Sequence, residues 1–419
     1  MQLVAYGAQD VYLTGNPKVT FFQAVYKRHT NFAMETIEQT MNGTAGSGGR
    51  VSVTVARNGD LIGDMYLEAT TVTTSMSNKS HDSNPDTNWI AERIVSTAEL
   101  SIGGQRIDKH YQRWWRLYSE LYLAEGSKLN YAKMTTNPVG NSTKQVYLPL
   151  IFFFNRNPGL ALPLIALQYH EVRIDIDLTS EFDTYVTGLK VWGNYMYLDT
   201  EERRRFAQKG HEYLIEQVQH TGTDALTASG TKQVRLSYNH PVKELVWCVT
   251  DGTSTGHNLW NLGVQTADAD VVISSGAGAG VANVCIGTSQ SGAPMFLRGP
   301  SAGAVDYVEE TVGPLSTAKL VLNGQDRFKE QSGKYFNQVQ PFAHHSGSPS
   351  AGVYSYSFAL KPEEHQPTGT CNFSRIDNAQ MSVTCGAAGD LSSLALQMFA
   401  VNYNVLRVQS GMGGLAFSN

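Results

Sequence analysis

The chain has 419 residues, of which 41% are hydrophobic and only 16% are charged, and it contains 39 glycines. A length of this order accommodates two domains of about 200 residues each. The small charged fraction argues against a helical bundle and favours a β-rich protein with many turns. The net charge of −5, with Arg203–Arg205 as the one basic run and acidic residues directly before it, argues against direct binding to nucleic acid.

Signals for targeting and for disulfide formation are weak. The opening sequence MQLVAYGAQD lacks the basic and apolar regions of a signal peptide. The most apolar segment, residues 147–167, is interrupted by asparagine, arginine and proline, so we predict no membrane span. The cysteines show no CxxC spacing, which favours free thiols in a reducing compartment. They are Cys248, Cys285, Cys371 and Cys385.

Short apolar or alternating segments, separated by turn residues, predict β-strands along the whole chain. In the first half these segments are 51–56, 65–73, 98–102, 145–154, 172–178 and 189–198. In the second half they are 213–218, 233–238, 244–250, 318–322, 353–360, 380–384 and 401–408. Two segments have helical spacing instead: residues 111–122, and a shorter run from Thr20 to Tyr26 in which Thr20 and Gln23 fit a capping box. We interpret both helices as packing elements.

Two short motifs occur once in each half of the chain. Residues 37–39 (IEQ) recur at 215–217, and residues 100–106 (LSIGGQR) resemble residues 320–326 (LVLNGQD). In each pair a strand is followed by a turn that contains glycine. The simplest explanation is the duplication of one β domain, and the alternative is coincidence between short matches.

The repeat suggests how the chain is divided. A charged stretch near residues 199–211 marks the joint, and two long loops lie at about 73–88 and 251–313. We predict an arm over residues 1–34, a first domain over 35–205 and a second over 206–419. Antiparallel strands with long inserts favour an all-β double jelly roll, which periodicity alone ranks only modestly above immunoglobulin-like sandwiches.

Paired aspartates in one predicted strand are a candidate for acid–base chemistry. Asp175 and Asp177 lie two residues apart, so both face the same side, as the carboxylates of a glycosidase would. Ile174 and Ile176 face the other side, which is the pattern of a half-solvated strand. We therefore favour a structural role and predict no catalytic residue here.

Four other motifs also have simpler interpretations. Residues 299–303 (GPSAG) match the G-x-S-x-G nucleophile elbow, but the strand before it and the helix after it are missing. Residues 276–280 (GAGAG) lack the further residues of a nucleotide-binding loop. We interpret both motifs as surface loop. His344 and His345 have no carboxylate or cysteine at ligand spacing, so we expect an exposed turn and no metal site. Trp114 and Trp115 could stack on sugars, but at least one should be buried against a sheet.

Long collinear segments resemble the major capsid proteins of nucleocytoplasmic large DNA viruses, particularly those of algal viruses such as the chlorella viruses. The resemblance begins with GAQDVYLTGNPKVTFFQAVYKRHTNFAME at residues 7–35 and covers nearly the whole chain except the two long loops. Its other segments are RNGDLIGDM (57–65), IGGQRIDKHY (102–111), PLIFFFNRNPGLALPLIALQYHEV (149–172), LDTEERRRFA (198–207), HEYLIEQ (211–217), LNGQDRF (322–328), YSFALKPEEHQPTGTCNFSRIDNA (356–379) and NYNVLRVQSGMGGLAF (402–417).

The resemblance implies a double jelly roll, three copies of which form a pseudo-hexagonal capsomer of an icosahedral shell. It implies neighbouring capsomers, minor capsid proteins and penton proteins as partners, with the arm on the inner side near an internal membrane. It implies no enzymatic activity, no cofactor and no direct contact with nucleic acid. The alternative from a different class is a carbohydrate-binding, lectin-like jelly roll.

Glycans are the one covalent modification that the sequence raises. Sequons begin at Asn42, Asn78, Asn141 and Asn372. Capsid proteins of the related algal viruses often carry glycans at asparagines outside the usual sequon, so the resemblance makes Asn258 and Asn283 in the long loop equally good candidates.

Overall fold

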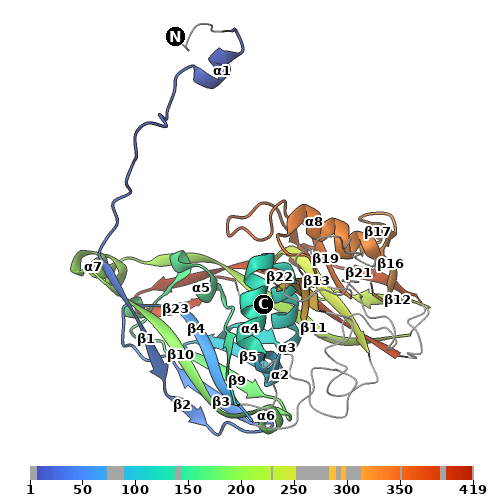
Figure 1. Cartoon of the computed structure of the whole chain (residues 1–419), viewed down its shortest axis with the longest axis horizontal. Coiled ribbons are helices and arrows are strands. Elements are labelled where there is room, and N and C mark those ends of the chain that lie inside the picture. Colours follow the sequence, from blue (N-terminus) through green and yellow to red (C-terminus); the bar gives the residue numbers. More distant parts are fainter. Residues whose placement is uncertain are drawn as a thin grey trace.

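The computed structural model describes residues 7–72, 89–136, 143–227, 230–251, 283–288, 294–298, 313–349, 352–386 and 393–417. Two pairs of antiparallel sheets form the body, and residues 7–31 extend away from it as an arm that contains the short helix α1 (Asp10–Thr14) (Figure 1). The predicted loops at 73–88 and 251–313 lie largely outside the described residues, as do both glycine motifs.

The first half of the chain folds into two facing sheets. One sheet has the order β1-β10-β4-β7, with β8 beside β4, and the other has the order β2-β3-β9-β5-β6. The strands of the first sheet are β1 (Phe32–Gln39), β10 (Val186–Leu198), β4 (Leu61–Thr71), β7 (Gln145–Pro149) and β8 (Leu162–Pro163). Those of the second are β2 (Met41–Gly43), β3 (Arg50–Thr54), β9 (Val172–Leu178), β5 (Val95–Ile102) and β6 (Gln105–Tyr111).

The second half repeats this arrangement. Its sheets have the orders β11-β22-β13-β19 and β12-β21-β16-β17, with β20, β23 and β18 off the main paths. The first contains β11 (His211–Thr227), β22 (Ser393–Gln409), β13 (Pro241–Asp251), β19 (Val353–Ser357), β20 (Cys371–Asn372) and β23 (Met412–Leu415). The second contains β12 (Gly230–Arg235), β21 (Ala379–Cys385), β16 (Leu315–Leu322), β17 (Gln325–Asp326) and β18 (Gln331–Ser332). A separate hairpin joins β14 (Asn283–Thr288) and β15 (Pro294–Arg298).

The two sequence repeats occupy matching places in the two halves. Residues 37–39 lie on the edge strand β1 and residues 215–217 on the edge strand β11. The second repeat forms the β5–β6 hairpin in one half and the β16–β17 hairpin in the other. In the latter turn Asn323 and Gly324 have φ angles of 50° and 79°, the left-handed backbone that a two-residue hairpin requires. Duplication of one β unit explains these correspondences.

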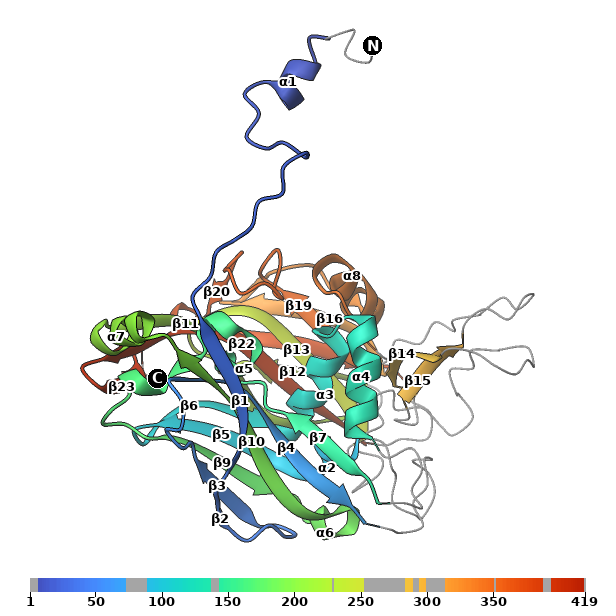
Figure 2. The same ribbon diagram turned by 60° about the vertical axis from the view of Figure 1, so that its left-hand side comes forward.

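The helices lie mainly along the rims and at the joint between the halves (Figure 2). They are α2 (Ile90–Arg93), α3 (Gln112–Leu121), α4 (Glu125–Thr135), α5 (Phe153–Arg156), α6 (Phe182–Tyr185), α7 (Thr200–Gln208) and α8 (Gln340–His344). Short 3-10 turns are η1 (Pro158–Leu160), η2 (Leu164–Ala166) and η5 (Phe373–Arg375), and η4 (Tyr335–Val339) is a π-helix. The predicted helix at 111–122 is confirmed as α3.

The prediction of a helix from Thr20 is wrong. Residues 17–31 contain no helix, and their side chains are exposed. A short amphipathic helix gains most of its stability from packing its apolar face, and the body offers this segment no surface in the structure.

The predicted strand at 145–154 is also wrong in its second part. β7 ends at Pro149, and α5 begins at Phe153. The side chain of Asn155 accepts a hydrogen bond from the Phe152 backbone N–H at 3.2 Å, which stabilises the first turn of the helix. Apolar residues on every side of a short buried helix give the same sequence pattern as a buried strand.

Candidate functional site at the joint between the two halves

One hydrophobic core runs through the joint, so the two halves are not separate bodies linked by a hinge. Buried residues of β11, β13 and β22, among them Ile215, Val246 and Phe399, pack into the same cluster as the core of the first half. The ring of Trp114 on α3 lies 5.7 Å from the ring of Phe399 on β22. Burial of this apolar surface fixes one half against the other.

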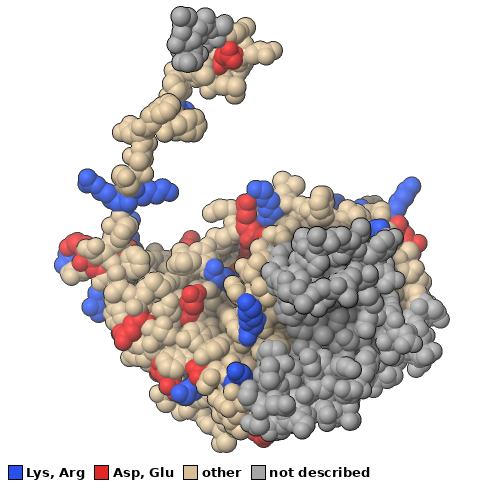
Figure 3. Space-filling view, viewed as in Figure 1, with Lys and Arg blue, Asp and Glu red and all other residues tan. Residues whose placement is uncertain are grey.

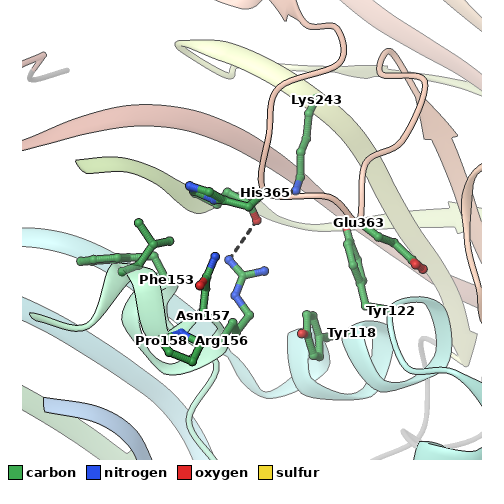
Figure 4. A pocket seen from close by; sticks show the side chains of 11 residues that line it. Tyr118, Tyr122, Phe153, Arg156, Asn157, Pro158, Lys243, Glu363 and His365 are labelled. Carbon is green, nitrogen blue, oxygen red and sulfur yellow. Dashed lines mark hydrogen bonds and ion pairs between the residues drawn. The ribbon is translucent and has the colours of Figure 1, made fainter. Parts of the chain in front are cut away.

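Three charged side chains from different elements meet beside this core. The Glu216 carboxylate on β11 accepts from the Lys243 ammonium of β13 at 2.6 Å and pairs with the Arg156 guanidinium of α5 at 2.9 Å. Figure 4 shows Arg156 rising from α5 while Lys243 approaches from the second half. Burial would raise the pKa of Glu216, but the two adjacent cations outweigh it and hold that pKa below its ordinary value. Glu216 is therefore charged at neutral pH.

A second group of charges lies next to the first. Glu244 on β13 accepts from the hydroxyl of Tyr122, the residue directly after α3, at 2.5 Å and pairs with the Nε2 atom of His345. The Nδ1 atom of the same imidazole lies 3.3 Å from Glu363. Burial lowers the pKa of His345, but the two carboxylates raise it more, to about 9, so the imidazole is protonated at neutral pH.

The loop that contains His345 packs closely against the C-terminal end of α3. Gly347 packs so closely that a β-carbon there would meet the backbone oxygens of Glu120, Leu121 and Leu123 at 2.7–2.8 Å. The Lys128 ammonium of α4 donates to the Ser348 carbonyl at 2.7 Å. A protonated imidazole beside the carboxyl end of a helix is also favoured by the helix dipole. We call residues 345–348 the clasp.

The charges of the joint balance one another. The cations are Arg156, Lys243 and protonated His345, and the carboxylates are Glu216, Glu244 and Glu363. Four of them, Arg156, Lys243, Glu216 and Glu363, line a cavity of about 280 Å³ together with Tyr118, Tyr122 and His365 (Figure 4). Because these charges are already paired, the arrangement is suited to holding two domains together rather than to activating a substrate.

Sequence reasoning missed most of this cluster, although one signal was available. Lys243 and Glu244 interrupt the apolar strand sequence PVKELVWCVT, and adjacent charges within a buried strand require partners. Glu216 lies in the repeated IEQ motif, which marks its position but not its partners.

The structure places the paired aspartates on the solvent side of a sheet, among cations. Asp175 pairs with Arg173 at 2.8 Å and with Arg50 at 3.3 Å, while Asp177 accepts from the Thr97 hydroxyl at 2.8 Å. Hydrogen bonds and the two arginines hold the pKa of Asp175 below its ordinary value against the effect of burial. This is the half-solvated strand that the alternation predicted.

The expectation of an exposed turn at His344–His345 is wrong for His345, whose side chain is fully buried. The carboxylates that hold it come from β13 and from residue 363, which local spacing could not reveal. No group of three or more metal-ligating residues occurs within the part of the chain that the structure describes. Both Trp114 and Trp115 are buried, which confirms that they are core residues rather than a sugar platform.

The glycosylation candidates are only partly visible. Asn42 on β2 and Asn372 on β20 are exposed, and the Asn372 side chain accepts from the Ser374 backbone N–H at 3.0 Å. Asn283 begins β14, whose side chains are not described, and Asn78, Asn141 and Asn258 lie outside the described residues. All six stay predictions.

The arm exposes an unusual number of large apolar side chains. Phe21, Phe22 and Tyr26 are 95%, 99% and 88% exposed, and Val11, Tyr12, Leu13, Val19 and Val25 are exposed as well. Basic side chains lie on the arm near the body, where Lys27 and Arg28 are adjacent, whereas both signs of charge are scattered over this face of the body (Figure 3). Exposed apolar residues at this density mark an interaction surface. Within the described residues, no helix is long and apolar enough to span a membrane.

Two antiparallel β-sandwiches with the same sheet order, joined side by side through one core, define a double jelly-roll protein of the viral capsid type. This assignment agrees with a solved structure, a quasi-atomic model of the PBCV-1 virus capsid, which has a TM-score of 0.78 and 40% identity and covers 96% of this chain and 100% of that one. The Faustovirus major capsid protein shares the fold, with a TM-score of 0.70 at 13% identity over 96% of this chain and 94% of that one.

Sequence comparison identifies the family. Residues 202–414 match the large eukaryotic DNA virus major capsid protein family, and residues 20–199 match the major capsid protein N-terminus. The major capsid protein of Paramecium bursaria Chlorella virus 1 is 46% identical, covering 100% of this chain and 99% of that protein. The major capsid protein of Phaeocystis pouchetii virus is 40% identical with the same coverage. The chain belongs to the major capsid protein family of large eukaryotic DNA viruses, a family of structural proteins of the virion.

Proposed function

We propose that three copies of this chain form a closed homotrimer, the capsomer that tiles the icosahedral shell of a large double-stranded DNA virus. The observation that supports this is the repeated sheet order of the two halves across a continuous core. Each chain is a rigid pair of similar blocks, so three chains present six blocks in a pseudo-hexagonal outline.

The physical requirements of such a capsomer are specific. In a three-fold ring, one patch of each copy meets a different patch of the next, and the ring closes without free interfaces. A permanent contact of this kind buries on the order of 2,000 Å² or more. The buried charges of the joint serve this role because a trimer can tile a lattice only if the angle between its two blocks is fixed.

We infer that the exposed arm faces the inside of the shell, where minor capsid proteins, penton proteins and an internal membrane are the expected partners. The arm's exposed aromatic residues and its detachment from the body support an interaction role. The acidic net charge of −5 supports a shell protein without direct contact to the genome. We propose a purely structural role, with no catalytic chemistry at the joint.

Light scattering after size exclusion tests the proposed capsomer. We expect a species near three times the 45.9 kDa of one chain that persists on dilution, and hexagonal arrays of it by electron microscopy. A monomer at all concentrations, with no change when minor capsid proteins are added, would contradict the proposal.

Intact-mass measurement of the virion protein tests the glycans. Masses above that of the bare chain, localised by peptide mapping, would show which asparagines carry sugar. A mass equal to the bare chain would remove all six candidates.

A further inference from the structure

A second cavity lies where the arm joins the body. It has a volume of about 350 Å³, and its walls come from the β1–β10–β4 sheet, from α5 and η1, and from α7. Most of its lining is apolar, and these apolar residues are Phe32, Met34, Phe154, Pro158, Met196 and Leu198. We call it the root groove. An apolar cavity of about 150 Å³ already accepts a benzene molecule, so the root groove has room for an aromatic side chain.

Two carboxylates at this groove have no partner among the residues that the structure describes. Asp64 on β4 and Glu202 on α7 line it. The Oε2 atom of Glu202 is buried without a hydrogen-bond partner among the described residues, and Asp64 forms no ion pair or hydrogen bond with any of them. Asp64 is exposed, and partial desolvation raises its pKa above its ordinary value. The Glu202 oxygen has lost water without gaining a partner, and the Asp64 carboxylate lines the same groove, so this acidic rim indicates a cationic ligand.

The arm has the complementary chemistry. Tyr26 is a large exposed aromatic residue, and Lys27 and Arg28 follow it directly. Neither cation forms an ion pair among the described residues. In an extended segment, Tyr26 and Arg28 face the same side, so one segment can place a ring in an apolar cavity and a guanidinium beside its acidic rim.

The arm of the same chain is poorly placed to fill its own groove. Thr30 and Phe32 line the groove themselves, so Tyr26 would have to reverse direction within three residues of the lining. The arm instead points away from its own body, beside α7 (Figures 1 and 2). An extended chain spans roughly 3.3 Å per residue, so the 25 residues before Phe32 can reach a neighbouring molecule.

We propose that the arm of each copy docks into the root groove of a second copy, with Tyr26 in the apolar cavity and Arg28 facing Asp64 and Glu202. Each copy then gives one arm and receives one, which is a heterologous contact that closes in a ring. This inference rests on the proposed assembly and specifies a contact within it.

Photo-crosslinking from the arm tests the contact. A tagged full-length chain carries benzoylphenylalanine in place of Tyr26 and is produced together with an untagged chain that lacks the probe. We expect a tagged–untagged cross-linked dimer whose joined peptide includes root-groove residues such as Met34 or Met196. The same probe in place of Tyr12, another exposed aromatic residue of the arm, is the matched control and should give little of this product.

Charge exchange tests the recognition itself. Glu202→Lys or Arg28→Glu alone should reduce the cross-linked dimer at least several-fold, and the double variant should restore much of it. Arg28 is exposed and Glu202 is partly buried, so circular dichroism checks the fold of each variant. Glu201→Lys, on the exposed side of the same helix, should leave the cross-link unchanged.

Several outcomes would overturn the inference. A cross-link only within the probe-bearing chain would show that the arm folds back on its own groove. A cross-link to other surfaces, or protection of the probe only by vesicles containing anionic lipid, would assign the arm to another partner. A stable trimer by light scattering without a groove cross-link would leave the proposed capsomer intact and reject this contact alone, whereas a monomer without a cross-link would reject both.

Discussion

At the scale of single residues, Glu216 stands out because its carboxylate pairs with two cations of the joint. It compensates the nearly inaccessible ammonium of Lys243 and the partly buried guanidinium of Arg156. Removing one member of a buried ion pair leaves an uncompensated charge, whereas exposed pairs contribute little.

Neutralising this carboxylate should therefore destabilise the fold. We expect Glu216→Gln to lower the free energy of unfolding by about 3–5 kcal/mol, measured by chemical denaturation. The matched control is Glu212→Gln on the same strand as Glu216. It removes an exposed ion pair with Arg407 of β22 and should lower the free energy of unfolding by less than about 1 kcal/mol. Equal effects of the two substitutions would show that the joint does not depend on its buried charges.

His345 makes stability depend on pH in a defined direction. Its pKa is raised from 6.5 in the unfolded chain to about 9 in the folded protein, so the folded state binds the proton more tightly. The stabilisation is complete below about pH 6.5 and is lost as the pH rises through 9.

The melting temperature should accordingly fall between about pH 6.5 and pH 9. His345→Gln should be less stable at pH 6 and should lose most of this slope, because its side chain does not titrate. His344→Gln, at a partly buried neighbouring position without a carboxylate partner among the described residues, should keep the slope of the unaltered protein. Thermal melts in a pH series distinguish the two, and an unchanged slope in His345→Gln would refute the assignment.

At the scale of elements, the clasp ties a loop of the second half to α3 and α4 of the first. Its closest approach is at Gly347, where the backbone oxygens at the end of α3 leave no room for a β-carbon. Those oxygens belong to backbone that is itself fixed by packing, so they cannot move at low cost.

Substituting alanine at this position should loosen the clasp. We expect Gly347→Ala to lower the free energy of unfolding by about 1–3 kcal/mol, through overpacking. Gly126→Ala on α4, where a β-carbon would meet nothing within 4 Å, should be neutral or slightly stabilising. Denaturant unfolding of both variants provides the measurement, and a neutral Gly347→Ala would mean that the loop adapts freely.

At the scale of the whole molecule, the body is stabilised by buried apolar surface and the arm is not. The core of the first half continues into β11, β13 and β22, and a second cluster fills the rest of the second half, while the side chains of residues 7–34 are exposed. The described arm residues bury no side chain against the body, so we expect the body to fold without the arm.

Deleting residues 1–30 should leave the melting temperature of the body within a few degrees of the full chain while weakening assembly into larger arrays. Calorimetry measures the first effect and electron microscopy the second. If the truncated chain failed to fold, the arm would be part of a core, and the boundary predicted at residue 34 would have to move.

The sequence alone determined the local pattern of this protein. Alternation identified strands such as β9, helical spacing identified α3, and the two repeats identified a duplicated β unit, because these signals depend on neighbours a few residues apart. Long collinear segments resembled the major capsid proteins of large DNA viruses, and the comparisons confirm this family. The division into residues 1–34, 35–205 and 206–419 stays a prediction, although the matches to the two family profiles meet near residue 200.

Only the tertiary structure decided how distant charges meet. His345 and Glu244 are about one hundred positions apart in sequence, and Arg156 reaches Glu216 from the other half, so no local spacing indicates either pair. The same reason explains the misjudged helix at Thr20, since an amphipathic pattern predicts a helix only where a surface exists to cover its apolar face. Whether such a surface exists is a property of the whole fold, because burial is decided by residues far away in the chain.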